Sequence, residues 1–263
     1  MNYRISAIYF SPTNTTKTIV KTIANGIDHN YKEYNLTLPQ KREQYKELTF
    51  NSDELIVVGV PVYRGRIPDF MVDYFSKYKG NSTKAIFTVT YGNRDYDDAL
   101  LELKDLFEKR GFIGIAAGAF IGEHSNTSKV ATDRPDADDL NIALQFVEKI
   151  KSGLNERIDL TKHRLTVKGN YPYKEMPQGP IILPETNDRC TDCAICANTC
   201  PMGAIDFINF RDIDPDKCIR CCNCVKICPE NAKAFIAAPF IEFTEVLITK
   251  LAVGRKEPEV FLI

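Results

Sequence analysis

The sequence lacks the features that assign proteins to several common classes. It has no tryptophan, only three histidines, no Gly-x-Gly-x-x-Gly dinucleotide fingerprint and no Gly-x4-Gly-Lys phosphate loop. Its longest near-apolar run, Phe112 to Gly122, is too short to span a bilayer. A net charge of −1 argues against nucleic acid, which requires a concentrated basic surface. We therefore expect neither a membrane nor a nucleic-acid partner.

The remaining composition is typical of a globular protein. Of the 263 residues, 44% are hydrophobic and 26% are charged, which is enough for one ordinary domain and a smaller one. The segment Met1–Phe10 favours a strand and lacks the charged-then-apolar layout of a secretion signal. We therefore expect a cytoplasmic location, in an anaerobe or a reducing cytosol. The sequence does not indicate the oligomeric state.

Eight of the nine cysteines form two copies of one spaced motif. The first is Cys190-x2-Cys193-x2-Cys196-x3-Cys200, and the second, 28 positions later, is Cys218-x2-Cys221-x2-Cys224-x3-Cys228; a proline follows each copy. This internal duplication has the ligand spacing of bacterial 4Fe–4S proteins. The short spacing lets one loop present three thiolates to three corners of a cubane, and thiolate suits iron–sulfur clusters. The motif predicts a protein that transfers electrons.

The fourth cysteine of each copy precedes a proline, a residue that favours the first position of a helix. We therefore expect Cys200 and Cys228 where a loop turns into a short helix, pointing away from their own loop. In two-cluster ferredoxins this cysteine ligates the other cluster. The predicted ligands are exchanged accordingly: one 4Fe–4S cluster takes Cys190, Cys193, Cys196 and Cys228, and the other takes Cys218, Cys221, Cys224 and Cys200.

Two other interpretations of the cysteines are weaker. Zinc ribbons use two separated pairs, whereas here three cysteines fall within seven residues and a fourth precedes proline. Disulfides require an oxidising compartment, for which the sequence carries no export signal. The ninth cysteine, Cys222, aligns with Ala194 of the first copy. We interpret it as a buried small residue and not as a redox group.

Strand and helix patterns alternate over the first ~150 residues, which predicts an α/β domain with a doubly wound, five-stranded parallel sheet. The expected helices begin near Asn14, Asp97 and Pro135. The expected strands are Tyr3–Phe10, Glu33–Leu38, Leu55–Val60, Lys84–Thr90 and Ile113–Ile121. The predicted organisation is a domain over 1–153, a Pro/Gly-rich connector over 154–185, a small cysteine domain over 186–237, and a tail over 238–263 that packs on the body.

A loop rich in hydroxyl and amide side chains follows the first expected strand. It contains Ser11, Thr13, Asn14, Thr15 and Thr16. Hydroxyls and free N–H groups at a helix N-terminus can hold one phosphate dianion. The alternative is ordinary helix capping, although one cap needs only one such residue. Because open parallel sheets bind ligands at the carboxyl ends of their strands, the loops after the third and fourth strands belong to the same candidate site.

With this loop, the chain resembles flavodoxins, and specifically the flavodoxin–ferredoxin fusions of anaerobic bacteria. Flavodoxins hold the FMN phosphate with a Ser/Thr-x-Thr-x-x-Thr loop, which Ser11-x-Thr13-x-x-Thr16 matches. The resemblance implies a flavodoxin-like domain that binds FMN and a small α+β ferredoxin domain with two 4Fe–4S clusters. It also implies two loops that hold the isoalloxazine ring, with Tyr63 or Tyr96 against a ring face. The loop residues are Pro61, Val62, Tyr63 and Gly65, and Thr90, Tyr91, Gly92, Asn93 and Tyr96.

The expected ring loops depart from those of flavodoxins. No tryptophan is available to stack on the flavin, and Arg64, Arg66 and Arg94 stand where flavodoxins tend to be acidic. These arginines either pair with neighbouring aspartates or place a positive charge near the flavin, where it would raise the flavin potential.

His124 follows the fifth strand and lies at the same end of the sheet. Either it makes structural hydrogen bonds, or it faces the flavin or the cluster domain.

These residues are compatible with three functions. We expect an electron carrier without a dedicated catalytic residue, because FMN takes two electrons one at a time and each cluster passes one. The resemblance implies low-potential partners, such as hydrogenases or ferredoxin-dependent oxidoreductases acting on 2-oxoacids. The alternative is an FMN-dependent oxidoreductase acting on NAD(P)H or a small acceptor, against which the missing dinucleotide fingerprint counts. The third is a ferredoxin whose first domain is a docking scaffold without flavin.

Overall fold

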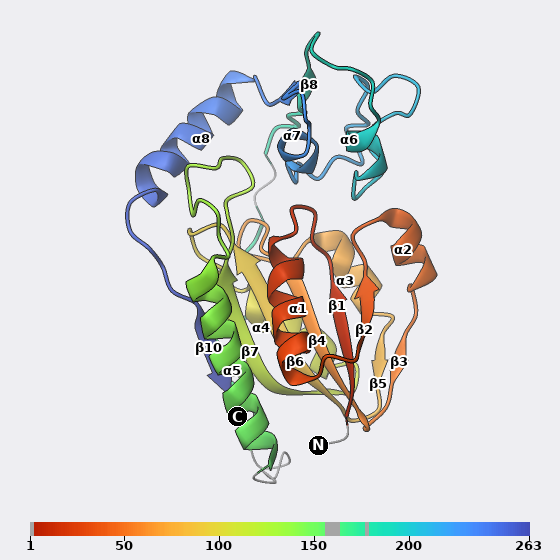
Figure 1. Cartoon of the computed structure of the whole chain (residues 1–263), viewed down its shortest axis with the longest axis vertical. Coiled ribbons are helices and arrows are strands. Elements are labelled where there is room, and N and C mark those ends of the chain that lie inside the picture. Colours follow the sequence, from red (N-terminus) through yellow and green to blue (C-terminus); the bar gives the residue numbers. More distant parts are fainter. Residues whose placement is uncertain (1–2, 156–163, 177–178) are drawn as a thin grey trace.

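The computed structural model describes residues 3–155, 164–176 and 179–263. Figure 1 shows an α/β domain with a smaller domain beyond one end of its sheet. The elements of the α/β domain are β1 (Arg4–Tyr9), α1 (Thr15–Ile27), β2 (Tyr31–Asn35), α2 (Pro39–Gln44), β3 (Thr49–Phe50), β4 (Glu54–Pro61), α3 (Asp69–Phe75), β5 (Lys79–Gly80), β6 (Thr83–Tyr91), α4 (Ala99–Glu108), β7 (Phe112–Ile121) and α5 (Ala137–Asn155).

The central sheet has the strand order β10-β7-β6-β4-β1-β2. The five long strands of the first domain pair in parallel, and their order along the chain is 2-1-3-4-5, the flavodoxin-like order. This confirms the doubly wound α/β fold and all five expected strands. The short β3 and β5 form a separate parallel pair. The carboxyl ends of the long strands point toward the smaller domain (Figure 1).

A sixth strand joins the sheet from the far end of the chain. β10 (Glu259–Leu262) pairs antiparallel with β7, with Val260 opposite Gly118 and Phe261 opposite Ala117. Val260 packs with one side of the sheet and Phe261 with the other. The sequence predicted five strands, whereas the sheet has six. The additional strand forms because β7 has a free edge of small residues, which an alternating apolar segment can cover.

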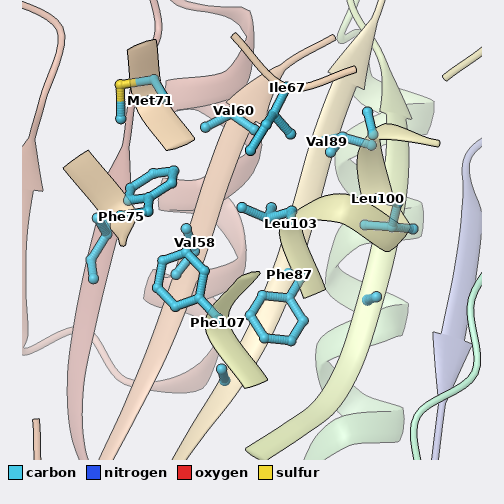
Figure 2. Packing of buried hydrophobic residues seen from close by; sticks show 14 of the residues in the cluster. Val58, Val60, Ile67, Met71, Phe75, Phe87, Val89, Leu100, Leu103 and Phe107 are labelled. Carbon is cyan, nitrogen blue, oxygen red and sulfur yellow. The ribbon is translucent and has the colours of Figure 1, made fainter. Parts of the chain in front are cut away.

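Helices cover both faces of the sheet. On one face, Val20 and Ile23 of α1 pack with Phe146 and Val147 of α5, all of them buried. On the other face, α3 and α4 lie against β4 and β6. Figure 2 shows this second layer, in which Phe107 of α4 lies among side chains of the two strands and of α3. A helical apolar stripe against an apolar strand face is what the sequence periodicity predicts.

The connector returns along the first domain. Leu165 and Val167 are buried in the core beside α4, and the N–H groups of Asn170 and Lys174 donate to the Asp98 carboxylate at 2.7 Å and 2.6 Å. Residues 156–163 and 177–178 of the predicted connector lie outside the described residues. The described part of the connector thus lies against the surface at the start of α4.

The small domain repeats its own backbone. Its elements are β8 (Glu185–Thr186), α6 (Ile195–Asn198), α7 (Asn223–Lys226) and β9 (Lys233–Ala234). Three pairs of residues related by the 28-residue repeat share left-handed backbone conformations: Asp192 and Arg220, Ala194 and Cys222, and Gly203 and Asn231. The same hydrogen bond also recurs, from Ala204 N–H to Cys200 Sγ at 3.3 Å and from Ala232 N–H to Cys228 Sγ at 3.2 Å. The duplication is therefore structural as well as sequential.

The structure around the fourth cysteine of each copy differs from what the sequence predicted. α6 and α7 precede Cys200 and Cys228, and each prolyl residue begins a turn instead of a helix. Proline has no N–H group, so it cannot extend the hydrogen-bond ladder of the helix that has just formed. The prediction of a loop that becomes a helix after Cys200 and Cys228 was therefore wrong. The helix follows the αL residue between the second and third cysteines.

A final helix, α8 (Ala238–Leu251), connects the small domain to β10. It lies within the predicted tail and has Pro239 in its first turn. Only Leu247 of α8 is buried. In Figure 1 the helix extends beside the small domain, and the chain then descends to β10 at the sheet edge. The part of the tail that joins the sheet is therefore the strand.

Candidate functional site

The loop between β1 and α1 leads into the N-terminus of α1. Asn14 precedes α1 with φ of 66°, and its own side chain makes no capping hydrogen bond. Ser11 is held by two bonds: its N–H donates to Thr37 Oγ1 at 3.0 Å, and its Oγ accepts from the Lys17 N–H at 2.9 Å. Thr16 is 1% exposed, and its Oγ1 has no hydrogen-bond partner among the described residues. The loop keeps a buried hydroxyl available to a ligand, beyond what capping requires.

The ends of β6 and β7 converge on this loop. A Cβ atom on Gly122 would lie 2.8 Å from Thr15 and 2.9 Å from Thr90, so a side chain does not fit there. Thr90 Oγ1 and Asn93 Oδ1 are also buried without a partner in the described part of the chain, as is Thr16 Oγ1. A buried polar atom without a partner costs free energy. Three such atoms near the carboxyl edge of one sheet fit a polar ligand such as FMN at that edge.

The two loops expected to hold a ring are fixed to each other. The Val62 N–H donates to the Thr90 carbonyl at 2.9 Å, and the Asp98 N–H donates to the Gly65 carbonyl at 3.0 Å. Gly65 has φ of 90°, and a Cβ on it would lie 2.2 Å from Asp97 Oδ2. Glycine is required here by both the backbone conformation and the close approach. The loops therefore form one rigid edge beside the hydroxyl loop.

Of the two candidate tyrosines, Tyr96 does not present its ring to the site. It is 1% exposed, its hydroxyl donates to Glu259 Oε2 of β10 at 2.8 Å, and its ring packs on Tyr91. Burial, and then the Glu259 carboxylate, raise the pKa of Tyr96. Tyr96 is thus a core residue beneath the tail strand. Tyr63, in the loop after β4, remains the candidate for contact with a ring.

Arg66 and Arg94 of these loops pair with acidic side chains. Arg66 makes a forked pair with Glu102, with Nε at 2.8 Å and Nη2 at 2.5 Å, and it also donates to the Lys174 carbonyl at 2.8 Å. Arg94 pairs with Asp97. The partner of Arg66 is thus a glutamate on α4 instead of a neighbouring aspartate. These pairs stiffen the ring loops and neutralise the two cations locally.

His124 lies against the loop after β6. A Cβ on Gly92 would lie 2.6 Å from the imidazole ring, and His124 Nδ1 accepts from the Asn126 N–H at 3.1 Å. Burial, followed by the charges of Lys226 and Arg94, lowers the pKa of His124 to about 4. The imidazole is therefore neutral at pH 7. It forms a wall between the candidate flavin edge and the small domain.

The cysteines gather into two sets around two hollows. The first hollow is lined by Cys190, Cys193, Cys196 and Cys228. The second is lined by Cys218, Cys221, Cys224 and Cys200, with Cys222 beside them. Each hollow therefore includes one cysteine from the other copy of the motif. No three metal-ligating side chains among the described residues converge as they would on a single ion. All nine thiols are free of disulfides.

Burial raises the pKa of several of these thiols. It raises the pKa of Cys224 to about 12 and that of Cys221 well above its usual range. Lys233 opposes this effect at both Cys196 and Cys224, one residue from each set. Such thiols bind metal only as thiolates. Cluster binding at these positions must therefore displace protons.

The second copy of the motif lies against the candidate flavin edge. Burial, and then the sulfurs of Cys221, Cys222 and Cys218, raise the pKa of Tyr63 well above its usual range. Ile219, within the second copy, packs against the core of the first domain. Lys226 of α7 pairs with Glu123, and Cys222 Sγ lies 3.7 Å from Asn126 Oδ1. The second set of cysteines is therefore the one next to the ring loops.

Comparison with known proteins agrees with the two parts of the structure. Residues 211–233 match the family model of the 4Fe-4S binding domain. No curated protein is similar in sequence to the chain. Among solved structures, the chain is similar to a flavodoxin from the domain Archaea, with 14% identity over 58% of this chain and 99% of that one and a TM-score of 0.39. It is also similar to a Streptococcus pneumoniae TIGR4 flavodoxin, with 15% identity over 57% of this chain and 98% of that one and a TM-score of 0.39. A third similar structure is the rubredoxin oxygen:oxidoreductase of the anaerobe Desulfovibrio gigas, with 13% identity over 60% of this chain and 37% of that one and a TM-score of 0.39.

The strand order of the first domain is flavodoxin-like, and the cysteine region carries the match to the 4Fe-4S binding domain. The chain therefore joins a flavodoxin-like fold to an iron–sulfur region. No described helix is long and apolar enough to cross a membrane.

Some residues of the site carry no sequence signal. Thr37 bonds the hydroxyl loop from the β2–α2 connection, and Arg42 of α2 reaches the ferredoxin domain. Lys233 is buried beside both cysteine sets. Only for Lys233 is there a clue in the sequence, because the repeat aligns it with the apolar Ile205.

Proposed function

We propose that the protein carries electrons between redox partner proteins through two 4Fe–4S clusters and one FMN. When bound, FMN accepts two electrons one at a time, and each cubane passes one. The observation that carries this proposal is the contact of the second copy of the motif with the first domain, through Ile219 on the core and the Lys226–Glu123 pair. Two redox sites held next to each other in one chain can exchange electrons without a docking step.

The exposure of the cysteines supports an order for the transfer. Cys193, in the first set, is exposed, whereas each of the four cysteines of the second set is partly buried. We propose that the first cluster meets the partner protein and that the second passes electrons to or from the flavin. Hydrogenases and ferredoxin-dependent oxidoreductases have the one-electron chemistry that such a partner requires.

The role of the chain's own residues is positional. Thr16 and Thr90 offer unpaired hydroxyls to the FMN, and Ser11 supports the phosphate loop. Ile219 and His124 keep water from the space between the flavin edge and the second cluster, the first by packing and the second as a neutral ring. Excluding water lowers the local dielectric, so fixed charges act more strongly on the redox potentials.

An anaerobic titration of the purified protein tests this function. NADH is added, then NADPH, then a chemically reduced low-potential ferredoxin, and the flavin and cluster absorbances are followed together. The carrier function predicts that neither nucleotide reduces the protein and that the ferredoxin reduces both chromophores. Prompt reduction by either nucleotide would instead establish an FMN-dependent oxidoreductase. Absence of flavin from an acid extract would leave only the scaffold interpretation.

A further inference from the structure

Arg42 of α2 connects the two domains through the interior of the protein. Its side chain is buried, at 3% exposed. Nη1 donates to the carbonyls of Leu36 and Thr37, at 3.0 Å and 2.7 Å. Nη2 donates to the Pro201 carbonyl at 2.6 Å and approaches Met202 Sδ at 3.7 Å. One guanidinium therefore joins the flavodoxin-like domain to the two residues that follow Cys200.

The guanidinium lies in a cage of aromatic rings. Its central carbon is 5.1 Å from the centroid of Phe70, 5.6 Å from that of Tyr74 and 5.9 Å from that of Phe10. Aromatic faces attract a cation, and the attraction is stronger when the cation is desolvated. Phe10 of this cage immediately precedes Ser11 of the hydroxyl loop. The cage therefore holds the guanidinium charge beside that loop, on the side that faces the ferredoxin domain.

The charge of Arg42 lacks a balancing carboxylate in the described part of the chain. None of the ion pairs found among those residues includes it, and its Nε is buried without a partner. Burial lowers the pKa of Arg42, whereas Tyr74 and Cys200 oppose that effect. Arginine keeps its proton in proteins, so the positive charge persists. A buried cation is costly unless an anion lies nearby.

A cluster at the second cysteine set supplies that anion. Four thiolates outweigh the charge of an oxidised cubane core, and reduction by one electron adds a further negative charge. We propose that Arg42 is the buried counter-charge of the cluster held by Cys200, Cys218, Cys221 and Cys224, and that it raises the reduction potential of that cluster selectively. The inference rests on the proposed function, because it requires the cluster to be bound. A higher potential at this cluster draws electrons from the exposed cluster toward the flavin.

Two variants separate the charge of Arg42 from its hydrogen bonds. Arg42→Gln removes the charge but keeps a donor for the Pro201 carbonyl. Arg42→Lys keeps the charge but loses the two separate Nη donors that join the domains. Arg110→Gln is the matched control, because Arg110 is a partly buried arginine that donates to the Tyr78 carbonyl. Iron, sulfide and flavin contents are measured first in the wild-type protein. A chain without a second cluster disproves the proposed function and the inference with it, whereas a loaded chain isolates the role of Arg42.

The readout is an anaerobic redox titration monitored by electron paramagnetic resonance. A Cys193→Ala variant identifies the signal of the exposed cluster by its loss. For Arg42→Gln we expect the ratio of reduced to oxidised second cluster at fixed potential to fall about tenfold, which is ~59 mV for a one-electron couple. The exposed cluster should be unchanged, and Arg42→Lys and Arg110→Gln should titrate like the wild type. An unshifted second cluster in Arg42→Gln overturns the inference. So does a tenfold shift in Arg42→Lys, which remains decisive if the glutamine variant fails to fold.

Discussion

Cys222 occupies in the second copy of the motif the place that Ala194 occupies in the first. Both residues precede a short helix in the left-handed conformation, with φ of 62° and 59°. Both side chains must be small, since the loop turns tightly around the cluster hollow. Cys222 is 3% exposed, and burial raises its pKa to about 12. We therefore interpret it as a buried structural residue, despite its place between two predicted ligands.

The first prediction concerns this position. Cys222→Ala should leave the iron content unchanged and the stability within about 1 kcal/mol, because the repeat already accepts alanine there. Cys222→Val should lower the iron content, because a β-branched residue is strained at positive φ and crowds the hollow. Iron and sulfide analysis of the anaerobically purified variants checks both. Loss of iron in the alanine variant would show that Cys222 is a ligand.

The second prediction concerns Lys233. Lys233 is 3% exposed, and its Nζ donates to Thr186 Oγ1 at 2.6 Å and to the Phe210 carbonyl at 2.7 Å. Lys233→Met should lower the potentials of both clusters, since the charge acts on a cysteine of each set. It should also cost about 1–3 kcal/mol of stability through the two buried acceptors left unpaired.

The repeat provides the control for that experiment. Ile205 occupies the equivalent position of the first copy and is equally buried. Ile205→Met changes packing in the same way without removing a charge, so it should move neither potential. Redox titration of both variants gives the answer. Equal shifts in the two variants would mean that packing, and not charge, sets the potentials.

The third prediction concerns the phosphate loop. Thr16→Val keeps the shape of the side chain but removes the unpaired buried hydroxyl. It should weaken FMN binding about tenfold, or ~1.4 kcal/mol, while leaving riboflavin binding unchanged, because riboflavin has no phosphate. Thr18→Val is the control, since Thr18 Oγ1 donates to the Asn14 carbonyl on the exposed side. Fluorescence titration of flavin-stripped protein measures these affinities. Equal losses for FMN and riboflavin would place Thr16 away from the phosphate.

The fourth prediction concerns pH. The pKa of His124 is about 4 in the folded protein, below the ordinary histidine value of 6.5. The unfolded chain therefore binds the proton first as the pH falls, and stability is lost below about pH 6.5. Between pH 7.5 and 5.5 this loss amounts to at most about 1.3 kcal/mol. His124→Gln should be less pH-dependent by that amount in anaerobic urea unfolding followed by circular dichroism. Identical pH dependence in the two proteins would show that His124 titrates normally.

Much of the fold and the cofactor chemistry was predictable because its signals are local. The cysteine spacing specifies a ligand loop whatever surrounds it, and the alternating strand and helix patterns fixed the five parallel strands. Arg42 could not be predicted, because its partners lie about 160 positions away in sequence. β10 was missed for a similar reason, as its apolar alternation has meaning only beside the small residues of β7. The helices before Cys200 and Cys228 escaped prediction because four residues are too few to show a helical period.

The most direct test of the whole account is an anaerobic electron count. The oxidised holoprotein is titrated with dithionite while flavin and cluster absorbance are recorded. Two clusters and one FMN predict about four electrons per chain, with both chromophores bleached by the end. An end point near two electrons, with flavin or cluster bleaching alone, would contradict the assignment of three redox centres to one chain.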